Sequence, residues 1–148
     1  MLTRRTALGL IAATPFIARP AFAASPEVFS NDNGAIRGFD PVAYFTTGGP
    51  VEGTDDLKLM WRGAQWRFAD PVHMGMFESD PEAFAPQYGG YCAYAVSKGG
   101  IATTDPEAWT IHDGKLYLNF NLTVRGIWSQ DIPGNISKAD ANWPSVLA

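Results

Sequence analysis

The stretch "AWTIHDGKLYLNF", residues 108–120, carries the clearest fold signal in the sequence. Trp109 and Ile111 alternate with polar residues before an Asp-Gly pair, and Leu116 and Leu118 alternate in the same way after it. Asp-Gly is a favoured two-residue connection between strands because both positions must take positive φ. Residues two apart in a strand share a face. The stretch therefore predicts an antiparallel hairpin with an apolar face.

A second hairpin is predicted upstream. Residues 57–61, "LKLMW", alternate in polarity, and residues 65–69, "QWRFA", do so again after a short Arg-Gly-Ala turn. Trp66 and Phe68 fall on the same face of the second arm. The sequence therefore predicts two hairpins, and the residues between them show a different pattern.

That region is marked by Asp-Pro pairs, in which Asp can cap a helix and Pro suits its first turn. The pairs predict short helices or turns after residues 40, 70, 80 and 105. Asn121 is expected to cap a helix over 122–130, and a last helix is expected over 134–142. The fold class predicted is α+β: a small antiparallel β-sheet of two hairpins with several short helices packed on it.

The first 23 residues are predicted to be a cleavable targeting segment. Arg4 and Arg5 precede a mostly apolar stretch over 7–18, and Ala21-Phe22-Ala23 fits a signal-peptidase site. The paired arginines favour the twin-arginine export route, with an ordinary secretory signal as the alternative. We therefore expect a periplasmic protein. An apolar stretch of about 12 residues is too short to span a membrane, so no span is expected after cleavage.

The mature chain is expected to hold one domain. Residues 24–35 are polar and rich in turn formers, which indicates a flexible N-terminal arm before a domain over 36–144. After residue 23 there are 8 Lys and Arg against 15 Asp and Glu, a net charge of about −7. Nucleic acid is therefore not an expected partner, because phosphate contacts need clustered cations.

Four motifs in this order resemble the YHS-domain family, in particular its exported bacterial branch. They are "GFDPVAYF" (38–45), "WRGAQWRFAD" (61–70), "FESDPEAFAPQYGGYCAYAVSKG" (77–99) and "DPEAWTIHDGKLYLNFN" (105–121). The resemblance implies a module that binds a transition metal. Ala43 and Ala69 stand where metal-associated members often have cysteine, and His73 stands at a third such position. A site of four thiolates is therefore excluded within a chain that has one cysteine.

The soft-metal candidates that remain are Cys92, His73 and Met76. His73 and Met76 are three apart on an expected helix, so they share a face. Thiolate, imidazole and thioether together suit copper in its Cu(I) form. If the helix lies beside Cys92, the three could bind a copper ion in a storage, sensing or delivery role.

Other interpretations of these residues remain open. Cys92 could instead be a small buried residue, the commonest role of a free cysteine, or a reactive thiol, although no Lys or Arg lies near it in the sequence to lower its pKa. Tyr88, Tyr91 and Tyr94 surround it and could line a pocket for a small ligand or for another periplasmic protein, or could only pack. Tyr91 and Tyr94 would share a face if a helix began at Gly90. The sequence has no recognised catalytic motif, so an enzyme is not expected.

Overall fold

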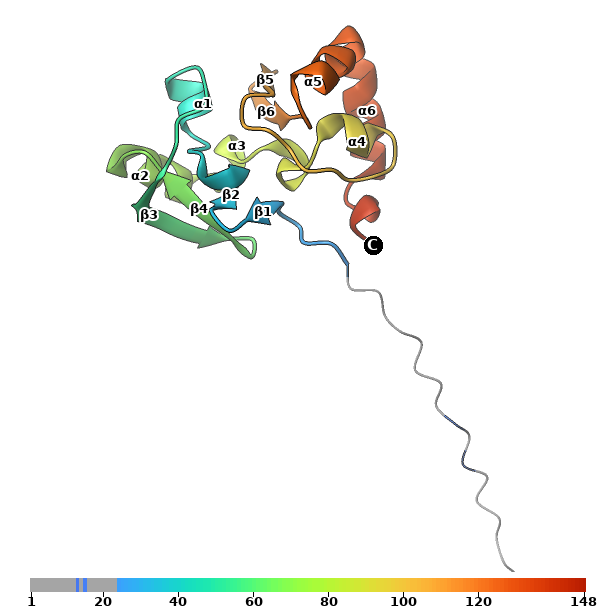
Figure 1. Ribbon diagram of the computed structural model, residues 1–148, viewed down its shortest axis with the longest axis horizontal. Helices are drawn as coiled ribbons and strands as arrows, with labels where there is room; N and C mark the ends of the chain where they lie inside the picture. The colour runs from blue at the N-terminus through green and yellow to red at the C-terminus, as the bar shows by residue number, and fades with distance from the viewer. Residues whose placement is uncertain (1–12, 14, 16–23) are drawn as a thin grey trace, which may run out of the picture.

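The structure is a computed structural model that describes residues 13, 15 and 24–148. The predicted targeting segment therefore lies outside the described residues, apart from two positions. Among the described residues, no helix combines the length and apolar character that crossing a membrane requires. The α+β class is confirmed, with short helices around small antiparallel sheets (Figure 1).

Both predicted hairpins are present. β3 (Thr54–Trp61) pairs with β4 (Ala64–Phe68), and β5 (Trp109–His112) pairs with β6 (Lys115–Leu118). They form separate two-stranded sheets instead of one continuous sheet. The Asp-Gly turn between β5 and β6 takes φ values of 49° and 74°, as a two-residue hairpin turn requires.

The helices begin where capping residues stand. Asp70 caps α2 and Asn121 caps α5, each accepting a backbone N–H three residues on. Asp80 precedes α3 without a side-chain cap, and Asp105 starts a turn that does not become a helix. The α-helices are α1 (Ala43–Thr46), α2 (Pro71–Ser79), α3 (Pro81–Phe84), α4 (Ala93–Ser97), α5 (Leu122–Trp128) and α6 (Ile132–Asn142). The 3-10 helices are Ile36–Gly38, Gln87–Gly90, Ser129–Asp131 and Ser145–Leu147.

Residues 24–35 differ from the expected flexible arm. They contain a third small hairpin, in which β1 (Ser30–Asn31) pairs with β2 (Gly34–Ala35). Val28 is buried in the core, and the backbone N–H of Phe29 donates to the carbonyl of Gly89. A few apolar residues among the polar ones are therefore enough to hold this segment against the domain.

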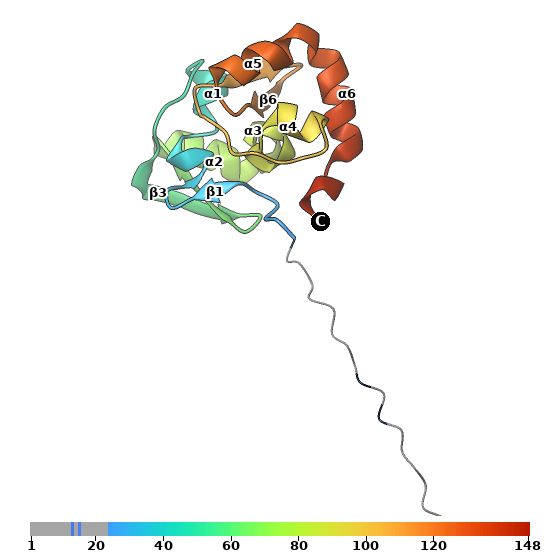
Figure 2. The same cartoon turned by 45° about the vertical axis from the view of Figure 1, so that its right-hand side comes forward.

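Strand β6 lies between two hydrophobic clusters. Its alternating side chains send Leu116 and Leu118 into one cluster and Tyr117 into the other. The first cluster contains Trp66, Phe68 and other residues of the N-terminal half, and the second contains residues of α4, α5 and α6. Figure 1 shows β6 between α1 and α5, and Figure 2 shows α6 and the β3–β4 hairpin at opposite margins. The stretch with the clearest sequence signal therefore joins the two halves of the domain.

Candidate functional site

His73 lies in the first turn of α2, close to the end of α1. The cap places it there, because the backbone N–H of His73 donates to Oδ1 of Asp70 at 2.8 Å. Its side chain is only 13% exposed, so the ring lies in a recess at the surface and not in free solvent. The ring is therefore held on one side and reachable on another.

Asp40 holds the inner side of that ring. Nδ1 of His73 lies 2.6 Å from Oδ2 of Asp40, whose side chain is 0% exposed. The same carboxylate accepts the backbone N–H groups of Val42, Ala43 and Ala69 at 2.8, 3.3 and 2.9 Å. An ionised carboxylate only accepts hydrogen bonds, so the hydrogen of this short contact belongs to Nδ1 of His73.

The outer nitrogen of His73, Nε2, is consequently the one that can accept a hydrogen bond or bind a metal ion. In a neutral imidazole, a hydrogen on Nδ1 leaves a lone pair on Nε2. Nε2 lies 3.0 Å from Oγ1 of Thr46, an exposed hydroxyl at the end of α1 that can donate either to this lone pair or to the carbonyl of Val42 at 3.2 Å. It also lies 3.7 Å from Oδ2 of Asp70, whose side chain is 47% exposed. One imidazole nitrogen and two oxygen atoms therefore gather at the same point of the surface.

Cys92 lies in different surroundings, immediately before α4. It is 1% exposed, and its thiol donates to Oδ1 of Asn119 at 3.6 Å. That amide oxygen also accepts the backbone N–H of Tyr94, and the N–H of Cys92 itself donates to the carbonyl of Ala102. This environment is the one expected for the small buried residue among the three interpretations.

The expected cluster of Cys92, His73 and Met76 is not brought together. Figure 1 shows α2 and α4 on opposite sides of the molecule. Met76 faces inward from α2 and packs against the first hydrophobic cluster, as Met74 also does. His73 and Met76 are three apart as predicted, but the ring turns toward Asp40 and the thioether toward the core.

The three tyrosines around Cys92 mainly pack. Tyr88 donates to Oδ1 of Asp140 and Tyr91 to the carbonyl of Pro26, each at 2.8 Å, and burial raises the pKa of both. Tyr94 is partly buried, with Nζ of Lys98 at 5.1 Å from its ring centroid. Tyr91 and Tyr94 do not share a helix, because the backbone before Tyr91 has positive φ at three successive residues and α4 begins only at Ala93.

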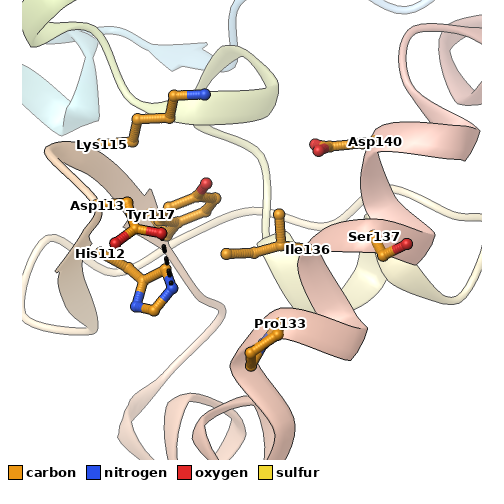
Figure 3. A pocket seen from close by; sticks show the side chains of 8 residues that line it. All are labelled: His112, Asp113, Lys115, Tyr117, Pro133, Ile136, Ser137 and Asp140. Carbon is orange, nitrogen blue, oxygen red and sulfur yellow. Dashed lines mark ion pairs between the residues drawn. The ribbon is translucent and has the colours of Figure 1, made fainter.

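A surface cleft lies between the β5–β6 hairpin and α6. Its volume is about 430 Å³, and Figure 3 shows hairpin side chains facing those of α6. The lining residues are His112, Asp113, Lys115, Tyr117, Pro133, Ile136, Ser137 and Asp140. Nε2 of His112 lies 3.4 Å from Oδ2 of its neighbour Asp113 (Figure 3). None of the three tyrosines expected in a pocket lines it.

Sequence reasoning found His73 but missed its partners. Asp40 and Asp70 were recognised only as helix caps, and Thr46 was not singled out. The available signal was the Asp-Pro motif itself, since two of its four copies supply carboxylates beside the ring. Nothing in the sequence, however, indicated that residues 40 and 73 would meet.

Within the described residues, no group of three or more His, Cys, Asp or Glu side chains is arranged to hold a metal ion. His73 and Asp70 therefore offer an incomplete set of ligands. No family model, curated protein or solved structure matches this chain. The functional argument consequently rests on the residues themselves.

Proposed function

We propose that this protein is an exported YHS-type module that binds a divalent transition-metal ion, copper first, at Nε2 of His73. The observation that carries the proposal is the 2.6 Å hydrogen bond between His73 and the buried Asp40. Histidine ligands of metals commonly donate their other N–H to a carboxylate, which fixes the tautomer and makes the free nitrogen more basic. Asp40 stands in that position, and its other contacts are all backbone groups.

The neighbouring oxygens suit the same ion. Nε2 of His73 and Oδ2 of Asp70 are 3.7 Å apart, which is less than the sum of two bonds of about 2.0–2.2 Å. A single ion could therefore bridge them with little movement. Imidazole and carboxylate ligands favour Cu²⁺ over the Cu(I) that thiolate and thioether would favour, and Cu²⁺ stands highest among divalent ions in the order of affinities.

Few ligands from the chain imply a labile ion. Two side chains and the Thr46 hydroxyl leave coordination positions for water or for a group from another protein. An ion held in this way exchanges readily, so delivery to a partner fits the site better than long-term storage. Catalysis forms no part of the proposal.

A titration of the mature protein with Cu²⁺ and Zn²⁺ by isothermal calorimetry tests the proposal. We expect one ion to bind per chain, Cu²⁺ more tightly than Zn²⁺. His73→Ala should abolish that binding. Asp70→Asn should weaken it, because a neutral amide replaces the negatively charged carboxylate. Asp40→Asn should also weaken it, by about 10- to 100-fold, the usual effect of losing the residue behind a metal-bound histidine.

The chain contains a matched control. His112 is the only other histidine, and it also lies beside an aspartate, at 3.4 Å. Its carboxylate neighbour is exposed and sequence-adjacent, so it does not fix the ring as Asp40 does. His112→Ala should leave binding unchanged. Equal losses in His73→Ala and His112→Ala would contradict the assignment, as would loss of binding in Cys92→Ala in a protein that remains folded.

The cleft beside α6 supports a second candidate, a module that binds a small organic cation. Asp113 and Asp140 face the cleft from opposite walls, and Lys115 is the one lysine or arginine among its described lining residues (Figure 3). The two carboxylates therefore leave the cleft with a net negative charge. Addition of ethylamine should then shift the amide NMR signals of residues 112–117 and 133–140. Asp140→Asn should reduce those shifts, whereas shifts that persist unchanged would count against this candidate.

A further inference from the structure

A small polar hollow lies beside the β1–β2 hairpin and the β3–β4 hairpin, and its lining residues do not include His73, Asp70 or Thr46. Its volume is about 150 Å³. It is lined by Asn33, Arg37, Gly38, Glu52, Gly53 and Arg67. Two of the eight Lys and Arg residues after position 23 therefore share one hollow in a chain with a net charge of about −7.

Arg37 is presented by an unusual backbone. Ile36 and Arg37 both have φ of 52°, a strained region that non-glycine residues rarely adopt. Nε of Arg37 donates to the carbonyl of Thr104 at 2.8 Å, which fixes the direction of the side chain. In the part of the chain that the structure describes, Arg37 forms no ion pair. Its terminal N–H groups therefore remain available for a ligand.

Arg67 packs closely against Gly53, which leaves no room for a side chain at position 53. A Cβ on Gly53 would overlap the Cβ of Arg67, and one on Gly38 would lie 3.5 Å from its Cδ. Nε of Arg67 is buried and has no hydrogen-bond partner in the structure. Its only ion pair among the described residues joins Nη2 to the exposed Asp55 at 3.3 Å. A buried N–H without a partner carries a free-energy cost, and the terminal nitrogens of Arg67 are the donors left for a ligand in the hollow.

We propose that this hollow binds a small oxyanion, a carboxylate or phosphate group, between Arg37 and Arg67. Guanidinium groups bind such anions through paired N–H···O bonds, and two of them at one place favour anions strongly. The amide of Asn33 supplies a further donor at the rim. The strained backbone at residues 36–37 and the close approach of Gly53 to Arg67 are then explained together, because they bring the two arginine side chains to one place. Glu52 carries the opposing charge in the hollow and limits the affinity.

An NMR titration with inorganic phosphate, and separately with acetate, tests the proposal. Backbone amide signals of Gly38 and Gly53 should shift on addition of at least one of the two anions, and the anion with the tighter binding identifies the class. Arg37→Gln should weaken that binding by about tenfold or more, since hydrogen bonds to charged groups are among the stronger ones. Arg37 is exposed, so this variant should fold normally.

Glu52→Gln gives the opposite result if the proposal is right: removal of the opposing charge should tighten binding of the same anion several-fold. Arg62→Gln is the matched control, because Arg62 is also exposed but is paired with Glu82 and stacked on Trp61, outside this hollow. It should leave the titration unchanged. Weaker binding in Glu52→Gln, equal effects of Arg37→Gln and Arg62→Gln, or no shift at Gly38 and Gly53 with either anion would overturn the proposal.

Discussion

Asp40 is the residue on which most of the proposed metal site depends. Its carboxylate is fully buried and joins three segments: the start of α1, the end of β4 and the first turn of α2. A buried charge is tolerated only when its hydrogen bonds are satisfied, and here four donors surround it. The same contacts that stabilise the fold also orient the imidazole of His73, so structure and proposed function share one side chain.

Asp40→Asn should be strongly destabilising. The amide group of asparagine would place N–H hydrogens against donors that now need an acceptor, at a cost of about 1–3 kcal/mol for each group left unsatisfied. Urea unfolding followed by tryptophan fluorescence measures the loss. Asp105→Asn is the control, since among the described residues the carboxylate of Asp105 accepts only the backbone N–H of Glu107, and the amide oxygen of asparagine can accept the same bond. A loss in Asp40→Asn no larger than in Asp105→Asn would contradict the role assigned to the carboxylate.

Cys92 should be protected in the native protein. Because its side chain is 1% exposed, a thiol reagent such as Ellman's reagent should react only as the protein unfolds. The rate of absorbance change with and without denaturant measures this protection. Rapid reaction in the native state would instead support the reactive-thiol interpretation.

At the level of helices and strands, the local signals were informative. Both hairpins and the helices capped by Asp70 and Asn121 could be predicted, because alternation, turns and caps act within a few residues. The failures came where distant contacts decide. Residues 24–35 are ordered by burial of Val28 and by a hydrogen bond to Gly89.

Two glycines test the backbone argument in opposite directions. Gly114 has φ of 74° in the β5–β6 turn, so Gly114→Ala should destabilise the protein by about 1–2 kcal/mol even though the space is open. Gly126 lies in α5 with open space and no positive φ, so Gly126→Ala should stabilise by up to about 1 kcal/mol. Thermal unfolding of the two variants should therefore move in opposite directions, and shifts of the same sign would contradict the assigned conformations.

In the whole molecule, β6 contributes side chains to both hydrophobic clusters. The N-terminal and C-terminal halves of the domain should therefore unfold together. The site at His73 also depends on this tertiary arrangement, because Asp40 and His73 are 33 residues apart in sequence. No local sequence pattern predicts a contact between residues so far apart. Sequence reasoning could therefore nominate the imidazole, but only the packing of α1, β4 and α2 supplies its carboxylate.

Alkaline pH should destabilise the protein. Burial raises the pKa of Tyr44, Tyr88, Tyr91 and Tyr117 above the ordinary value of about 10. The unfolded chain therefore loses these protons at lower pH than the folded one, and the stabilisation they provide is complete below about pH 10 and falls as pH rises above it. Urea midpoints measured from neutral to alkaline pH should decline in that range. Tyr88→Phe should reduce the decline, and an unchanged midpoint above pH 10 would contradict the burial of these hydroxyls.

The most direct test of the metal proposal is the anomalous diffraction signal from crystals of the mature protein soaked in Cu²⁺. We predict one strong peak about 2.0–2.1 Å from Nε2 of His73, on the side of Asp70, with Nδ1 still bonded to Asp40. A peak bonded to Cys92 or to His112 instead, or a soaked crystal without a peak at His73, would contradict the account.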